Sequence, residues 1–172
     1  MALVVFLRGV NVGGHKTFRP RLLADQLKPF GAVNIGAAGT FVIRKPVPLK
    51  QLRAELSRLL PFETMVAICH GHDIHRLMAA NVYGDERPGR DVVRFISVLP
   101  NKKPRLKKAL RWPAKGPWLV RILGQHERFI VGEYRRNMKT IGYLGGLDKA
   151  LGEPVTTRNW NTISTIAKTL SI

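Results

Sequence analysis

Residues 40–60 read TFVIRKPVPLKQLRAELSRLL, and a strand pattern gives way to a helix pattern within this stretch. Its first four residues, Thr40–Ile43, form a β-branched and aromatic run that is typical of a strand. Pro46 and Pro48 end that strand, because proline has no N–H to donate to a sheet. Leucines then recur at positions 49, 52, 56 and 59, so the spacing predicts an amphipathic helix over Leu49–Leu60.

The segments on either side complete an alternating order of strands and helices. Upstream, Ala2–Leu7 is an apolar run typical of a buried strand, and Val33–Ile35 is a second short strand. Between them, a helix is predicted to begin at Pro20 and to end before Gly31. Downstream, Thr64–Cys69 is the fourth strand. The order βαββαβ predicts an α+β fold with a ferredoxin-like first half.

The second half is expected to form a second, smaller α+β unit. Residues 83–90, YGDERPGR, have the composition of a loop, so we expect two domains, over 1–82 and 91–172. In chain order, we expect a helix over Ile74–Asn81, a strand over Val92–Leu99, a helix over Pro104–Leu110, a hairpin of Trp118–Leu123 with Arg128–Tyr134, and helices near Ile141–Leu151 and Asn159–Leu170.

The composition is that of a folded and strongly basic protein. The 172 residues include 29 Lys and Arg against 11 Asp and Glu, a formal net charge of +18. A small soluble domain usually has a net charge of roughly 2–8 in magnitude. The single cysteine excludes a disulfide framework and a Cys-rich zinc site. No apolar run approaches the ~18–20 residues that cross a bilayer, and the start lacks the pattern of a secretory signal, so we expect a cytoplasmic protein without a membrane partner.

A glycine-bearing loop follows the first strand and is a candidate anion site. Residues 7–17 read LRGVNVGGHKT, in which backbone N–H groups can point into one concavity. The loop differs from a phosphate-binding P-loop because His15 stands between the glycine and the lysine. The alternative is a tight turn with solvated charges. The candidate anion-binding residues of this loop are Arg8, Asn11, Gly13, Gly14 and Lys16.

A second motif, TTRNWNT, occupies residues 156–162 at the predicted start of the last helix. Thr or Asn can cap a helix there. Arg158 is unusual, because a cation in the first turn opposes the helix dipole unless an anion compensates it. We therefore add Arg158 and Asn159 to the candidate anion site, on the hypothesis that the two motifs meet in space.

The opening LRGVNVGG and the closing TTRNWNT together resemble a family of small bacterial proteins defined as domain of unknown function 1697. The two motifs lie at opposite ends, so the resemblance spans essentially the whole chain. A third family motif, Gln-Ser-Gly-Asn-Val-Val-Phe, would fall on residues 37–43, where only the glycine and the apolar strand match. The resemblance implies an α+β fold with ferredoxin-like halves, and it implies no particular activity, cofactor or substrate.

Basic residues are concentrated in the second half of the chain. Between Asn101 and Thr140 there are twelve Lys or Arg and only two acids, interleaved with three Trp or Tyr. Cations that contact phosphates and aromatic rings that stack on bases are typical of nucleic-acid binding. The alternatives are a solvated charged face, an acidic protein partner or a membrane surface. The expected nucleic-acid surface consists of Lys103, Lys107, Arg111, Arg135 and Arg136.

A metal or catalytic site finds little support. Cys69, His70, His72, Asp73 and His75 are close in sequence but lie where a strand gives way to a helix, and no second ligand pair is present. Cys69 and His70 are neighbours on a strand and point to opposite faces, so they make a poor nucleophile–base pair. We expect no metal and no cofactor, and the sequence names no catalytic residue.

The resulting hypothesis is a protein that binds an anionic ligand, with nucleic acid as the favoured ligand. One alternative is an enzyme that acts on a phosphorylated or carboxylated small molecule, held by the glycine loop. Another is a protein–protein adaptor that uses an edge or a face of its sheet. The sequence does not fix the oligomeric state.

Overall fold

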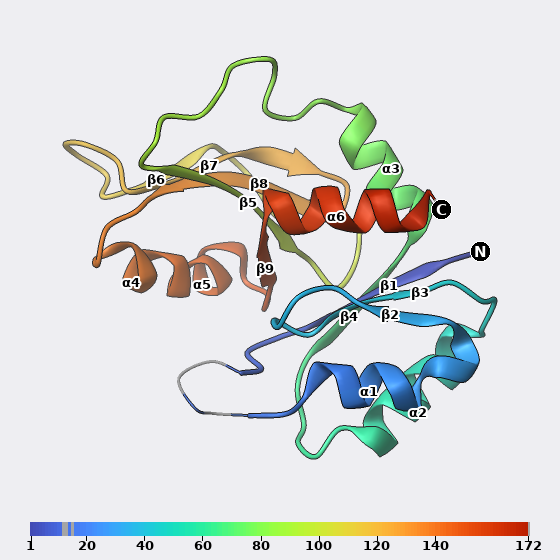
Figure 1. The fold of residues 1–172 in the computed structure, drawn as a ribbon. Helices are drawn as coiled ribbons and strands as arrows, with labels where there is room; N and C mark the ends of the chain where they lie inside the picture. The colour runs from blue at the N-terminus through green and yellow to red at the C-terminus, as the bar shows by residue number, and fades with distance from the viewer. Residues whose placement is uncertain (12–13, 15, 172) are drawn as a thin grey trace. The chain divides into compact units, whose positions relative to one another are not determined.

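The computed structural model of the protein describes residues 1–11, 14 and 16–171, and the fold is mixed α+β, as predicted (Figure 1). The chain divides into two compact units. Unit 1 consists of Met1–His75 together with Ser164–Ile172, and unit 2 consists of Arg76–Ile163.

Unit 1 is built on a four-stranded antiparallel sheet. Its strands are β1 (Leu3–Leu7), β2 (Ala32–Asn34), β3 (Thr40–Ile43) and β4 (Val66–His70), in the order β2-β3-β1-β4. Helix α1 (Pro20–Gln26) connects β1 to β2, and helix α2 (Leu49–Leu59) connects β3 to β4. This strand order and connectivity are those of the ferredoxin-like βαββαβ arrangement.

One face of the unit 1 sheet packs against both helices. Leu3, Val5 and Leu7 alternate along β1 and pack against leucines of α1 and α2, such as Leu23 and Leu52. The other positions of β1 are also fully buried. Strand β1 is therefore apolar on both faces, which explains why it stands out in the sequence as an uninterrupted hydrophobic run.

Unit 2 is built on a five-stranded antiparallel sheet. Its strands are β5 (Val92–Val98), β6 (Leu110–Trp112), β7 (Val120–His126), β8 (Phe129–Arg135) and β9 (Thr156–Asn159), in the order β6-β7-β8-β5-β9. Helices α4 (Thr140–Gly145) and α5 (Leu147–Leu151) follow β8. Leu147 and Leu151 of α5 pack with Phe95, Ile122 and Ile130 into the core of one face of this sheet.

The boundaries between the units lie inside two helices. Helix α3 (Gly71–Ala79) contains the boundary after His75, and helix α6 (Trp160–Leu170) contains the boundary after Ile163. The division therefore differs from the domains expected at 1–82 and 91–172: the boundary precedes the loop over residues 83–90, and the end of the chain returns to unit 1. In unit 1, Arg44 donates a hydrogen bond to the carbonyl of Thr169 at 3.2 Å.

Three predictions for the second half were wrong in detail. The helix expected over Pro104–Leu110 is irregular chain, because the amide N–H groups of Arg105 and Leu106 donate to the side chain of Gln125 and not to a helical ladder. The helix expected near Ile141–Leu151 is two short helices. The last helix begins at Trp160, within one residue of the predicted start at Asn159, but Arg158, expected in its first turn, lies in strand β9.

Candidate nucleic-acid interface

The glycine loop after β1 is braced by one of its own candidate residues. The side-chain amide of Asn11 donates to the carbonyl of Ala37 at 3.2 Å, and its oxygen accepts the N–H of Phe18 at 2.9 Å. Asn11 and Lys16 both have positive φ, and the N–H of Asn11 donates to the carbonyl of Lys16. Asn11 therefore has a structural role, because both ends of its amide are used within unit 1.

The other candidates of this loop are more open. Gly14 and Lys16 are exposed, and the Lys16 ammonium lies 5.9 Å from the centre of the Phe62 ring. Arg8 is half-buried, and its N–H donates to the carbonyl of Met65. Gly13 lies outside the described residues. An anion site at this loop stays a prediction.

Arg158 and Asn159 lie in strand β9. The Arg158 side chain donates to the hydroxyl of Thr156 at 3.0 Å and to the carbonyl of Thr157 at 2.9 Å, and the residue is 7% exposed. Burial lowers the pKa of its guanidinium to about 10. Arg158 therefore does not stand in the first turn of the last helix, and the dipole argument does not apply to it.

Asn159 caps helix α6, as the sequence suggested. Its side-chain oxygen accepts the N–H of Thr162 at 2.8 Å and the hydroxyl of the same residue at 3.0 Å. The glycine loop belongs to unit 1 and Asn159 belongs to unit 2. The hypothesis that the two motifs meet stays a prediction.

Four charged residues form a row across the sheet of unit 2. Arg111 on β6 pairs with Arg121 on β7, Arg121 pairs with Glu133 on β8, and Glu133 pairs with Arg94 on β5. Residues directly opposite one another in antiparallel strands project from the same face. The register thus brings three arginines and one carboxylate onto one face of the sheet, although they are up to 39 residues apart in sequence.

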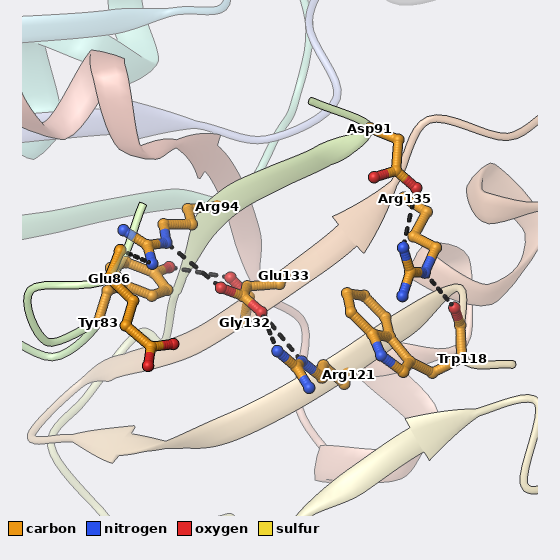
Figure 2. A network of polar contacts seen from close by, with 9 residues as sticks. All are labelled: Tyr83, Glu86, Asp91, Arg94, Trp118, Arg121, Gly132, Glu133 and Arg135. Atoms are coloured by element: carbon orange, nitrogen blue, oxygen red, sulfur yellow. Dashed lines mark hydrogen bonds and ion pairs between the residues drawn. The ribbon is translucent and has the colours of Figure 1, made fainter. Parts of the chain in front are cut away.

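Glu133 holds the middle of this row together. Its carboxylate accepts two hydrogen bonds from Arg121, at 2.9 and 2.7 Å, and one from Arg94 at 3.3 Å (Figure 2). The Glu133 side chain is 6% exposed, whereas that of Arg121 is 42% exposed. The buried carboxylate therefore fixes the positions of both arginines by hydrogen bonds. Part of the Arg121 side chain stays exposed to solvent.

Trp118 lies between two arginines beside this row (Figure 2). The guanidinium carbons of Arg121 and Arg135 are each 4.2 Å from the centre of the indole ring. Arg135 also donates to the carbonyl of Trp118 at 3.0 Å and to the carboxylate of Asp91 at 2.8 Å. Stacking on an aromatic ring restricts a guanidinium to one orientation, so both cations are positioned in advance. We call Arg94, Arg111, Arg121, Arg135, Trp118 and Glu133 the arginine face.

Tyr83 closes the other end of the arginine face. Its hydroxyl lies 2.5 Å from the carbonyl oxygen of Phe95 and 2.9 Å from that of Gly132, and Arg94 stacks on its ring at 4.8 Å (Figure 2). Burial, together with the charge of Glu133, raises the pKa of the Tyr83 phenol well above its ordinary value of 10.0. Tyr83 is therefore a neutral, fixed support for Arg94.

A pocket of about 310 Å³ borders Arg94 at the start of helix α6. Its walls combine cations and amides from separate parts of unit 2: Arg94 on β5, Arg136 after β8, and Asn159, Trp160 and Asn161 of the closing motif. Arg136 is exposed and donates to the carbonyl of Arg90 at 2.7 Å. The pocket thus joins Asn159, predicted as an anion ligand, to Arg136, predicted as part of the nucleic-acid surface.

The expected nucleic-acid residues divide into two groups in the structure. Arg111, Arg135 and Arg136 belong to the arginine face or lie next to it. Lys103 and Lys107 are exposed on the irregular segment that precedes β6. The predicted site residues did not include Arg94, Trp118, Arg121 or Glu133. Only the strand register reveals that Arg94, Arg121 and Glu133 align with Arg111.

The histidine-rich segment after β4 is arranged around a helix start. The rings of His70 and His72 stack at 5.2 Å, and the buried Asp73 accepts the N–H of His70 at 3.1 Å. Within residues 1–11, 14 and 16–171, no group of three or more His, Cys, Asp or Glu side chains could hold a metal ion. No helix in that part of the chain is long and apolar enough to cross a membrane.

These observations define an α+β protein with a ferredoxin-like unit and a basic sheet face in its second unit. The fold is similar to that of the conserved bacterial protein SP0830 from Streptococcus pneumoniae, with a TM-score of 0.59 and 15% sequence identity. The similarity covers 99% of this chain and 98% of that one. No protein-family model matches the sequence, and no curated protein does. The resemblance to family 1697 stays a prediction.

Proposed function

We propose that this protein binds nucleic acid through the arginine face of unit 2. The observation that carries the proposal is the placement of Trp118 between Arg121 and Arg135, next to the row that links Arg111, Arg121 and Arg94. Phosphates bind guanidinium groups through their N–H donors, and arginine is the preferred residue for such contacts.

Arg121 and Arg135 keep donors for a ligand after their internal contacts are made. Arg121 uses two of its nitrogens on Glu133, and Arg135 uses two on Trp118 and Asp91. A guanidinium has five N–H groups, so each retains some of them. Because these side chains are already ordered, phosphate binding would cost less conformational entropy than binding to free surface arginines.

The charge of unit 2 supports the same ligand. This unit carries 18 of the 29 Lys and Arg residues and 7 of the 11 acids. Four of those acids, Asp91, Glu127, Glu133 and Glu153, are paired with cations. The remaining excess of positive charge is available to attract a polyanion and to release its counterions.

The test is the salt dependence of binding to a labelled mixed RNA or DNA pool. We expect retention at about 50 mM salt and a steep loss by about 300 mM, since each neutralised phosphate contributes about 0.7–0.9 to the slope of log K against log salt. The double variant Arg111→Gln/Arg136→Gln should reduce that slope by about 1–2, because both residues are exposed.

The matched control is Lys28→Gln/Lys50→Gln, which removes the same charge from exposed positions of unit 1. We expect this variant to keep most of the slope. Absence of retention at 50 mM salt, or an equal loss in both double variants, would show that the arginine face is not a nucleic-acid interface.

A second candidate function is the binding of a small phosphorylated or carboxylated molecule in the pocket at the start of α6. It is favoured by one observation: Arg94, Arg136 and the amides of Asn159 and Asn161 line a pocket of about 310 Å³, at the lower end of the roughly 300–1,000 Å³ of ligand pockets. Calorimetric titration with inorganic phosphate and with a nucleoside monophosphate distinguishes this function from nucleic-acid binding. Saturable binding that Arg136→Gln abolishes, without binding of the nucleic-acid pool, would favour the small molecule.

A further inference from the structure

A second pocket of unit 2 lies apart from the arginine face and has a different composition. It has a volume of about 440 Å³. It lies between the chain from Pro104 to Leu110, the first residue of β6, and the last residues of helix α5 with Gly152 after them. This volume falls within the roughly 300–1,000 Å³ range of sites that hold small molecules.

The floor of this pocket is apolar. Leu106 and Leu110 line it and pack against the core cluster of unit 2, and Leu151, which is 5% exposed, belongs to that cluster. A ligand that reaches the floor would therefore bury apolar surface against leucines, which is favourable for a hydrocarbon or aromatic group and unfavourable for a bare phosphate.

The rim of the pocket is basic. Lys107, Lys108 and Lys149 line it and are exposed. Among the residues that the structure describes, none of these three lysines forms an ion pair, whereas Arg105, on the same wall, is bound to Glu153 at 2.7 Å. Glu153 also accepts a hydrogen bond from Asn101 at 3.1 Å. The carboxylate of Glu153 is thus bound by Arg105 and Asn101, and the three lysines can contact an anionic ligand.

The wall of the pocket is fixed by the side chain of Gln125. Its oxygen accepts the N–H groups of Arg105 at 2.9 Å and Leu106 at 3.1 Å, and its amide donates to the carbonyl of Lys103 at 3.0 Å. These hydrogen bonds hold a segment that has no helical or strand ladder of its own. The pocket is therefore formed before any ligand arrives, which lowers the entropic cost of binding.

We propose that this pocket binds a small amphiphilic anion: a short acyl or aryl group, seated on Leu106, Leu110 and Leu151, that ends in a phosphate or carboxylate held by Lys107, Lys108 and Lys149. The apolar floor selects against simple anions, and the lysine rim selects against neutral amphiphiles. The proposal does not depend on nucleic-acid binding at the arginine face, and it assigns Lys107 to a different ligand.

The experiment is calorimetric titration of the full chain with three probes: octyl phosphate below its micelle concentration, inorganic phosphate and octyl glucoside. We expect octyl phosphate to bind at least about tenfold more tightly than either of the others, because only it uses both the floor and the rim. Labelled leucine methyl groups should report the site, with NMR shifts at Leu106, Leu110 and Leu151.

The lysine rim is tested by the triple variant Lys107→Gln/Lys108→Gln/Lys149→Gln. This variant should bind octyl phosphate about tenfold or more less tightly, while the weak binding of octyl glucoside stays unchanged. The charge-matched control is Lys28→Gln/Lys45→Gln/Lys50→Gln, at exposed positions of unit 1, which should bind octyl phosphate as the unmodified protein does.

Three outcomes would overturn the proposal. Inorganic phosphate that binds as tightly as octyl phosphate would show attraction by charge alone. Octyl glucoside that binds as tightly as octyl phosphate would show that the apolar floor binds the ligand without the lysines. Sedimentation of the protein with anionic phosphatidylglycerol vesicles, without any binding of monomeric octyl phosphate, would show that the lysines face a membrane surface and not a small ligand.

Discussion

Strand β1 of unit 1 and strand β8 of unit 2 are both inner strands of an antiparallel sheet, but they carry different side chains. All five positions of β1, LVVFL, are apolar and buried. In β8, FIVGEYR, the first half is apolar, and the second half places Glu133 and Arg135 on one face. The comparison shows that a ferredoxin-like sheet and a charge-bearing sheet coexist in one chain.

The difference extends to how the acids are used. In unit 2, the buried Glu133 joins Arg94 on one neighbouring strand to Arg121 on the other. In unit 1, Glu55 pairs with Arg58 on the same exposed helix surface. An exposed pair of this kind contributes little to stability, typically about 0–1 kcal/mol. Charge is therefore part of the sheet structure in unit 2 and a surface feature in unit 1.

The largest expected effect tests how closely the unit 2 sheet is packed despite its charges. A Cβ atom at Gly132 would overlap the ring of Phe95, which lies opposite it and is fully buried. Gly132→Ala should therefore lower the free energy of unfolding by about 3 kcal/mol, as overpacking in a core does. Urea denaturation followed by circular dichroism measures this loss.

The matched control for this prediction is Gly124→Ala on the adjacent strand β7. A Cβ atom at Gly124 meets nothing within 4 Å, so this variant should change stability by no more than about 0.5 kcal/mol. Equal and small effects of the two substitutions would mean that the Phe95 ring can move aside and that the sheet is not tightly packed at Gly132.

The next effect tests whether charge stabilises the unit 2 sheet. Glu133→Gln keeps the shape of the side chain but removes the charge that two arginines share, so we expect a loss of about 2 kcal/mol in unfolding free energy. The same variant should bind the nucleic-acid pool more tightly than the unmodified protein, because it removes a negative charge from the arginine face while Trp118 still orders Arg121. Denaturation and fluorescence anisotropy measure the two quantities.

The counterpart in unit 1 is Glu55→Gln, which removes a half-buried carboxylate that pairs with the exposed Arg58 at 2.8 Å. We expect a change of less than about 1 kcal/mol. If Glu133→Gln lowered the free energy of unfolding no more than Glu55→Gln, the charge of Glu133 would not stabilise the sheet of unit 2. The contrast between the two units would then disappear.

The smallest effect concerns Tyr83 and alkaline pH. Because the pKa of Tyr83 is raised in the folded protein, the unfolded chain loses the phenolic proton first as the pH rises past 10.0. Folding stability from this residue is therefore present below pH 10.0 and is lost above it. Tyr83→Phe should lower the free energy of unfolding by about 1 kcal/mol at neutral pH, because a hydrogen bond is missing. Above pH 10, the free energy of unfolding of this variant should fall less steeply than that of the unmodified protein.

Stability curves of the two proteins between pH 8 and pH 11 measure this difference, and the other tyrosines and lysines contribute equally to both. Parallel curves throughout that range would show that Tyr83 ionises in the folded state as easily as in the unfolded chain. The burial of its hydroxyl against Phe95 and Gly132 would then be incorrect.

The sequence predicted unit 1 better than unit 2, for a physical reason. Strand β3 lies at Thr40–Ile43 and helix α2 at Leu49–Leu59, close to the predicted bounds, because burial in unit 1 follows local periodicity. In unit 2, the segment Pro104–Leu110 has the spacing of a helix. However, the side chain of Gln125 on strand β7 accepts the N–H groups of Arg105 and Leu106. A contact between distant residues outweighed local propensity there.

The candidate site could be predicted only in part for the same reason. Arg111, Arg135 and Arg136 were found from the density of basic residues alone. Arg94, Arg121 and Glu133 were not predicted as site residues, and they complete the row only through the pairing of β5, β7 and β8. Strand register is set by long-range pairing that composition does not encode, so the alignment of charges on one face is not visible in the sequence.

The division of helices α3 and α6 between the units has a consequence for synthesis. Unit 2 is one uninterrupted run of chain, Arg76–Ile163, whereas unit 1 also requires Ser164 onward. Leu170 packs closely on Gly71, and the carbonyl of Thr169 accepts the hydrogen bond from Arg44. On the ribosome, the four strands of unit 1 emerge first, whereas the residues of α6 that belong to the same unit are translated last.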